Sequence, residues 1–170
     1  MSRNHRAAFA AKRLQPSELP KFWRPKLTEA QRTDAQIIHW DLIARFTDGS
    51  ATAEDLWDWI ETGFTYARML NLLAEDGSEF TPEAIAAITE LLDSHHGVID
   101  RFRRTHRIGF DAEQLRIARA AACVMDALID MDRHGIAERA ARWSIQQTQA
   151  ARRMAASAPQ PSHPQPEHHP

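Results

Sequence analysis

The stretch 47-TDGSATAEDLWDWIETGFTYARMLNLL-73 decides the fold of this chain, because it joins a turn to a long amphipathic helix. Asp48 and Gly49 are typical of a tight turn, and Thr52 can cap a helix that has Asp55 at its third position. Apolar residues then recur at helical spacing over about five turns, with Trp57 and Trp59 on either side. Those residues are Leu56, Ile60, Phe64, Ala67, Leu70 and Leu73. Such a helix needs other helices to cover its apolar face.

Similar signals predict further helices on both sides of this one. Thr28 and Gln31 form a capping-box pair, and Thr81-Pro82 is a strong helix start because proline is well tolerated at the first helical position. Asp111 with Gln114 begins a fourth helix, which we expect to end at His134-Gly135. A weaker fifth helix is expected from about Ile136 to Ala155. The expected apolar stripes are Ala35, Ile37, Ile38, Leu42 and Phe46 in the first helix, Ile85, Ile88, Leu92, His95, Ile99, Phe102 and His106 in the third, Leu115, Ala118, Ala122, Met125 and Ile129 in the fourth, and Ile136, Ala140, Trp143, Ala150 and Met154 in the fifth.

The fold class that follows is all-α, an up-and-down antiparallel helical bundle of four to five helices. We expect the bundle domain over residues 28–155, because no strand-like alternation interrupts the helical pattern. Residues 1–27 form a basic arm with three prolines, in which Phe22 and Trp23 are expected to dock the arm. Residues 156–170 are rich in proline and histidine and predict a disordered tail.

Composition excludes several classes of protein. The 170 residues are 43% hydrophobic and contain no apolar run of about 18 residues that could span a bilayer. The first residues show no apolar stretch typical of a signal peptide, so we expect a cytoplasmic protein. Cys123 has no companion for a disulfide or a zinc site, and we interpret it as a small core residue.

Charge is segregated along the chain although the net charge is only −2. Residues 1–27 carry a net charge of +6, residues 28–100 carry −12, and residues 101–156 carry +5. This pattern favours either acidic helices that lie beside basic ones or a basic face offered to an anionic partner.

The stretch 91-LLDSHHGVIDRFRRTH-106 raises the question of a metal site. Histidine ligands on one helix need a spacing of three or four residues, whereas His95 and His96 point about 100° apart. His95 and His106 are separated by about 16 Å along the helix axis. We therefore predict no metal ligands here, and expect His95 and His106 to be buried or interfacial.

No pattern for covalent catalysis or nucleotide binding occurs in the sequence. There is no GxSxG motif, no glycine-rich phosphate loop and no cysteine placed with a histidine. The carboxylates of 54-EDLWDWIE-61 are interpreted as a solvated helix face. We therefore expect a protein that is not an enzyme and that uses no cofactor and no small-molecule substrate.

A DNA-binding protein is the main alternative. The basic cluster 101-RFRRTHR-107 precedes a short turn and a helix, an order that is compatible with a helix-turn-helix assisted by the basic N-terminal arm. The two helices are longer than is usual for that motif. The candidate nucleic-acid contacts are Arg101, Arg103, Arg104, Arg107, Gln114, Arg116 and Arg119.

The segment from Ile38 to Ala141 resembles a group of small uncharacterised bacterial proteins that travel with prophages and plasmids. The resemblance is carried by 45-RFTDGSATAEDLW-57 and 107-RIGFDAEQLRIARAAACVMDALID-130. It implies a helical fold and a mobile-element setting, and it implies no activity.

The leading hypothesis is a non-enzymatic helical protein that acts by binding another protein or itself, as an oligomer, an adaptor or an inhibitor. Tryptophan and histidine side chains beside the apolar stripes are the natural candidates for the interface, since aromatic residues are enriched at such surfaces. The candidate interface residues are Trp57, Trp59, His95, His106 and Trp143.

Overall fold

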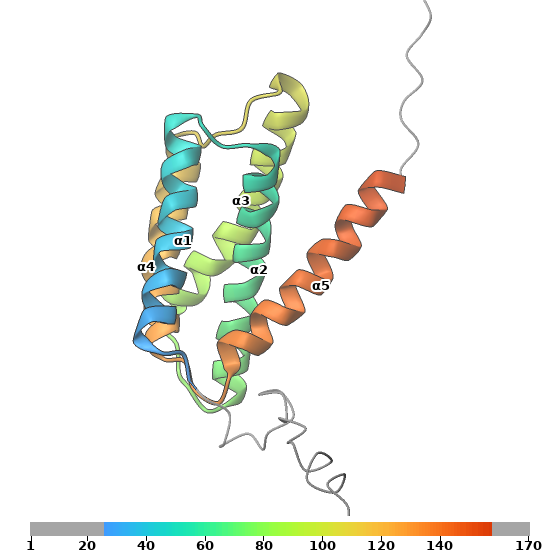
Figure 1. Ribbon diagram of the computed structural model, residues 1–170. Helices are drawn as coiled ribbons and strands as arrows, with labels where there is room; N and C mark the ends of the chain where they lie inside the picture. Colours follow the sequence, from blue (N-terminus) through green and yellow to red (C-terminus); the bar gives the residue numbers. More distant parts are fainter. Residues whose placement is uncertain (1–25, 158–170) are drawn as a thin grey trace, which may run out of the picture.

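The computed structural model describes residues 26–157, which form five α-helices and no strand (Figure 1). The helices are α1 (Glu29–Asp48), α2 (Ala53–Glu75), α3 (Pro82–Thr105), α4 (Ala112–Asp130) and α5 (Ile136–Ser157). The predicted all-α fold is therefore confirmed. The predicted tail after residue 157 and the arm before residue 26, including Phe22 and Trp23, lie outside the described residues.

Helices α1 to α4 form an up-and-down antiparallel bundle, and α5 packs outside it. In the bundle, α2 contacts α1 and α3, and α4 contacts the same two helices. Figure 1 shows α5 running back along α2 at an oblique angle to the other helices. The α2–α5 packing is the most extensive of all the helix pairs. Helix α2 is consequently covered on two sides, by the bundle core and by α5.

Local capping signals set the starts of the first four helices, as the sequence predicts. A threonine or aspartate oxygen accepts the N–H group of the third helical residue in each case, because the first turn of a helix has no carbonyl partners for its N–H groups. In three of these helices the third residue reaches back to complete a capping box. The capping residues are Thr28, Thr52, Thr81 and Asp111.

The end of α4 differs from the prediction. The helix stops at Asp130, before His134-Gly135, although both of these residues do adopt the left-handed conformation, with φ of 56° and 66°. The early stop is stabilised by Asp132, whose Oδ1 accepts the N–H group of Ala137 at 2.8 Å and so caps α5. The left-handed residues belong to the connection between the two helices.

An aromatic cluster closes one end of the bundle. Phe46 stacks on Phe110 with ring centroids 4.6 Å apart, and Trp59 packs against Phe110 at 5.4 Å. The Phe110 N–H group also donates to the Phe46 carbonyl oxygen at 3.2 Å. The turn between α3 and α4 is thereby fixed to the C-terminal end of α1.

The buried face of α1 is rotated relative to the predicted stripe. Leu42 and Phe46 are buried as expected, together with the unpredicted His39, but Ile37 and Ile38 are 58% and 56% exposed. The side of α1 that carries Ile38 faces α5 across a gap, and none of the five described helices covers it. The predicted helical period of α1 is correct, but the sequence does not show which other helix packs against each side of α1.

The buried face of α3 also differs, and the prediction for His106 is wrong. The buried positions are Ile88, Leu91, His95 and Val98. His106 is exposed and ends the helix in a left-handed conformation, with φ of 54°. The N–H group of His106 donates to the Phe102 carbonyl oxygen, so this residue terminates the helix and is not part of its seam.

Two residues that were expected to be buried, Cys123 and Met154, are exposed. Cys123 is exposed, because α4 buries the face with Ala121, Ala122 and Met125. Met154 is 69% exposed although it lies on the predicted stripe of α5. The residues of α5 that are buried against α2 are Ile136, Ala140, Ser144 and Thr148.

His95 occupies a space that a glycine on α2 leaves open. A Cβ atom at Gly63 would lie 2.5 Å from His95 Cε1, closer than real carbon atoms approach. The imidazole lies edge-on to Trp59 and Phe64, and its Nε2 has no hydrogen-bond partner within the described residues. Burial, and to a smaller extent the neighbouring His96, lowers the pKa of His95 to about 4.

We expect the Gly63→Ala substitution to destabilise the protein by about 1–3 kcal/mol, because the added methyl group overpacks the contact with His95 and outweighs the helix propensity gained. Urea unfolding of Gly63→Ala, His95→Ala and the double variant measures this coupling. The His95→Ala background should remove most of the penalty. Additive free energies in this cycle would show that the two residues do not touch.

The buried imidazole also predicts a pH dependence of stability. His95 stays neutral in the folded chain down to about pH 4, whereas the unfolded chain takes up a proton near the ordinary pKa of 6.5. Stability therefore falls as the pH drops through this window, by about 2 kcal/mol between pH 7 and pH 5. Urea unfolding at both pH values should show a smaller loss for His95→Gln and an unchanged loss for the exposed control His106→Gln. Equal pH slopes for wild type and His95→Gln would contradict the assignment.

Candidate functional site

A groove runs along α2 between α1 and α5, and we call it the α1–α5 groove. It consists of three adjoining cavities that share lining residues, the largest of about 460 Å³. Its floor is α2, and small side chains form much of its two walls, including Ala35 of α1 and Ala141 of α5. The two ends of the groove differ in chemistry.

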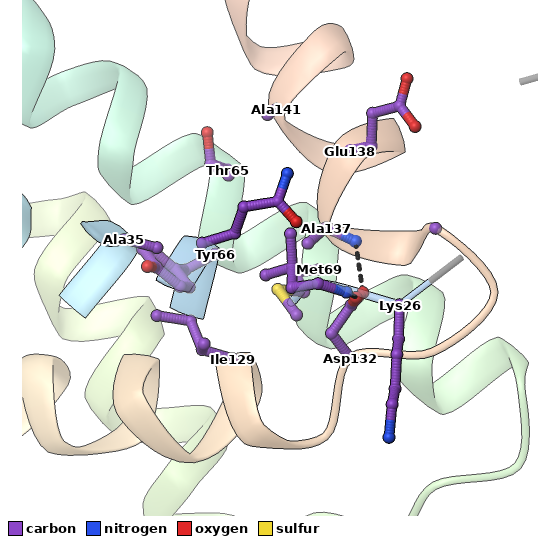
Figure 2. A pocket seen from close by; sticks show the side chains of 13 residues that line it. Lys26, Ala35, Thr65, Tyr66, Met69, Ile129, Asp132, Ala137, Glu138 and Ala141 are labelled. Carbon is purple, nitrogen blue, oxygen red and sulfur yellow. Dashed lines mark hydrogen bonds between the residues drawn. The ribbon is translucent and has the colours of Figure 1, made fainter. Parts of the chain in front are cut away.

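The apolar end is the largest cavity, near the N-termini of α1 and α5. Figure 2 shows Met69 and Tyr66 of α2 facing the start of α5, with Ile129 of α4 below them. Most of the lining surface is carbon, apart from the hydroxyl of Thr65 and the polar groups near the rim. A cavity of this size and lining is typical of sites that hold apolar side chains or small ligands.

Asp132 fixes the position of this end. Its buried carboxylate accepts the N–H group of Ala137 through Oδ1 and the N–H group of Leu27 through Oδ2, both at 2.8 Å (Figure 2). One side chain thus joins the segment that leads into α1 to the first turn of α5. The two walls of the groove are held together at this point.

The acidic end lies at the opposite end of the groove and is lined by four carboxylates. Arg45 pairs with two of them, Asp41 and Asp55, at N–O distances of 2.5 and 2.8 Å. Asp58 and Glu61 are the other two, and partial burial followed by the repulsion of neighbouring carboxylates raises the pKa of each. This end therefore has an excess of negative charge and favours a cationic ligand.

Beneath the floor, a hydrogen-bond network links three helices. His39 of α1 is fully buried, and its Nε2 lies 2.9 Å from Asp126 Oδ1 of α4. The Tyr66 hydroxyl lies 3.3 Å from the other ring nitrogen, and Trp40 Nε1 donates to Asp126 Oδ2 at 3.1 Å. The imidazole can therefore donate to the carboxylate while it accepts from the tyrosine.

Burial shifts the pKa of two members of this network toward their neutral forms. Burial lowers the pKa of His39 even though the Asp126 charge opposes that shift. Burial, with a smaller contribution from Asp126, raises the pKa of Tyr66. Burial therefore favours the protonated form of the Tyr66 hydroxyl at the floor of the groove.

Polar contacts attach α5 to α2 along the groove. Thr65 Oγ1 and Ser144 Oγ lie 2.5 Å apart in the middle of the pair. Near the C-terminal end of α5, Arg152 donates to Glu54 at 2.7 Å, and its guanidinium lies 5.2 Å from the centre of the Trp57 ring. These contacts keep α5 close to α2 and away from α1.

The five predicted interface residues do not form one surface. Trp59 is fully buried and His95 is 5% exposed in a single chain, so neither side chain lies on a surface open to a partner, and His95 takes the buried alternative of its prediction. Trp57 is half-buried under Arg152. Trp143 is 38% exposed and packs on Phe64, on the side of α5 that faces away from the groove.

The remaining candidate, His106, is exposed at the far end of α3. The central part of the groove was missed because most of its lining residues are alanine, threonine and tyrosine, which carry no signal of their own. The exposed Ile38 beside Tyr66 is recognisable only once the helices are placed.

The predicted nucleic-acid contacts are only partly available. Gln114 is buried, because its Oε1 accepts the Asp111 N–H group and its amide lies against Gly97, so it cannot reach a base. Arg101 is held by Asp111 and by the Gly109 carbonyl oxygen.

The other arginines of this set have carboxylate partners or remain exposed. Arg116 is held by Glu113 at 2.6 Å. Arg103, Arg104, Arg107 and Arg119 are exposed. The DNA-binding alternative stays a prediction that has lost Gln114 as a possible base contact and keeps the exposed Arg119.

Residues 26–157 contain no group of three or more histidine, cysteine, aspartate or glutamate side chains placed to hold a metal ion. None of the five helices is long and apolar enough to cross a membrane.

No family model, curated protein or solved structure matches this chain. The resemblance to small prophage and plasmid proteins therefore stays a prediction, and the function has to be argued from the groove itself.

We expect Asp132→Ala to destabilise the protein by about 1–3 kcal/mol, because it leaves two N–H groups at the apolar end without their acceptor. Urea unfolding measures the loss, and the exposed Asp130→Ala serves as the matched control. Hydrogen exchange should speed up at Leu27 and Ala137 in the first variant only. Unchanged exchange at both amides would show that Asp132 does not join the two walls.

Proposed function

We propose that this protein is a non-enzymatic binding module that takes a helical segment of a partner protein into the α1–α5 groove. The observation that carries this proposal is the continuous groove along α2, whose rim exposes Ile38 to 56%. A large apolar side chain left exposed beside a cavity marks a binding surface more often than an isolated exposed residue does. An amphipathic helix laid into an apolar groove is a common mode of peptide recognition.

The shape of the walls supports a ligand with large apolar side chains. Ala35, Ala137 and Ala141 occupy the two walls, and Thr62 and Thr65 lie on the floor. These small residues leave room that the ligand fills, whereas large wall residues would have filled the groove from within. Ile145, one turn after Ala141, extends the apolar wall and is 40% exposed.

The charge of the groove supports a ligand that is basic at one end. The acidic end holds four carboxylates against Arg45, with Arg152 lying 3.9 Å from Asp58. A cation placed there would relieve the repulsion between Asp58 and Glu61. We therefore propose a partner helix whose apolar face fits the apolar end and whose lysine or arginine side chains lie at the acidic end.

The side chains at the floor of the groove favour a binding function over a catalytic one. Tyr66 is the most reactive type of side chain there, and its pKa is raised by burial. We propose a cytoplasmic setting for this function, since a chain whose lone Cys123 cannot form an internal disulfide suits a reducing compartment.

Two adjacent isoleucines provide a matched test. Ile38 lines the groove and Ile37 does not, although their exposures are almost equal. We expect Ile38→Asp to weaken partner binding by at least roughly tenfold, which corresponds to about 1.4 kcal/mol, and Ile37→Asp to leave it unchanged. Affinity capture from cells that contain the protein, followed by titration of the captured partner, measures both. Equal effects of the two variants would overturn the assignment of the groove.

A further inference from the structure

We propose that residues 1–25 of the same chain occupy the α1–α5 groove when no partner is bound, so that this arm and the partner compete for one site. The inference rests on the proposed function only in treating the groove as a binding site. We assign the groove to this segment because of where it joins the fold, how far it can reach and what charge it carries.

The arm joins the fold at the apolar end of the groove. Lys26 and Leu27 are lining residues of that cavity. The Leu27 N–H group is bound to the buried carboxylate of Asp132, which fixes the direction in which the chain leaves. The segment that precedes Lys26 is therefore attached to the fold at the apolar end of the groove.

The arm carries its large aromatic residues close to this point. Phe22 and Trp23 precede Lys26 by four and three residues. An extended chain covers about 3.3 Å per residue, so the backbone of four residues spans at most roughly 13 Å, and both aromatic side chains are within reach of the cavity. The cavity of about 460 Å³ is lined mainly by carbon atoms and is left open by the side chains of residues 26–157. Burial of these two rings is the main favourable contribution that we assign to docking.

The charges of the arm and of the acidic end are complementary. Residues 1–25 carry six basic residues and Glu18 as the only acid. The nearest carboxylate of the acidic end on α2 is Glu61, eight residues before Met69, which is about 12 Å along the helix. Lys12 and Arg13 are separated from Lys26 by thirteen or fourteen residues, which span this distance even when the chain is far from fully extended.

The covalent link between the arm and the fold favours binding of the arm over binding of a free peptide. Linkage to the fold gives the arm an effective concentration near the millimolar range, so even weak contacts occupy the groove. A partner must then displace the arm, and its apparent affinity falls in proportion to the fraction of chains with an open groove. Reversing the charge of the arm should therefore strengthen partner binding.

Photocrosslinking on the full-length protein tests the inference. p-Benzoylphenylalanine replaces Ile38 in one sample and Ile37 in the control, and crosslinked peptides are identified by mass spectrometry. We expect crosslinks from position 38 to residues 1–25 within one chain, at a yield that does not change on dilution. The control with p-benzoylphenylalanine at position 37 should give few such crosslinks. Lys12→Glu combined with Arg13→Glu should lower the yield roughly tenfold, the loss expected from about 1.4 kcal/mol of ionic attraction.

Two results would overturn the inference. Crosslinks that join two chains and vanish on dilution would assign the groove to the arm of a second copy. An absence of crosslinks to residues 1–25 would show that the arm does not lie there. Circular dichroism melts confirm that the variants fold. As a second measurement, a spin label at Ser17→Cys in a Cys123→Ser background should broaden the NMR signals of Ala35 and Ala141, and not those of Ala84 on α3.

The photocrosslinker at position 38 also distinguishes a failure of this inference from a failure of the proposed function. In cells, position 38 should crosslink to the partner protein, and the Lys12→Glu, Arg13→Glu variant should give more of that product. A partner crosslink without crosslinks to the arm refutes the inference and leaves the proposed function standing. Crosslinks to the arm without any partner product refute the proposed function and leave the arm in the groove.

Discussion

The close packing of α5 on α2 decides what the rest of the molecule can do. The contact is made by small and polar side chains, with Ala140, Ser144 and Thr148 buried on α5 and Thr65 bonded to Ser144. Small residues let two helices approach closely, and their hydroxyl groups satisfy each other or a backbone carbonyl in the seam. Helix α5 is thereby committed to α2. Among the described residues it leaves the neighbouring side of α1 uncovered, which opens the α1–α5 groove and exposes Ile38.

Helix α2 can serve as the floor of the groove because it is anchored from below. Its buried face supplies Trp59 and Leu73 to the core, and Tyr66 reaches the His39–Asp126 pair, so that α1, α2 and α4 are tied together by one polar network. At the apolar end, Asp132 joins the segment before α1 to the start of α5. A floor and walls that are held independently of any ligand make a largely preformed site, which lowers the cost of binding.

The sequence predicted the helix starts well and the buried faces less well. Thr28, Thr52 and Asp111 could be identified because a capping residue acts within four positions of itself. The candidate interface residues predicted from the sequence include two core residues, because sequence features alone do not separate an interface from a core. Trp59 and His95 are large and sit beside apolar stripes, but the same features describe a core residue. Gln114 was expected to face DNA, whereas its second role in the capping box turned it inward.

The sequence by itself determined a helical bundle, the caps that begin its first four helices and the separation of a basic arm from an acidic central region. All of these depend on composition and on contacts a few residues apart. The tertiary structure alone decided that Ser144 and Thr148 are buried while Ile38 is exposed, which reverses the order of their hydrophobicity. The physical reason is that burial depends on which helix lies opposite. The choice of neighbour follows from the fit of side chains across the α2–α5 seam, and no periodicity within a single helix encodes that fit.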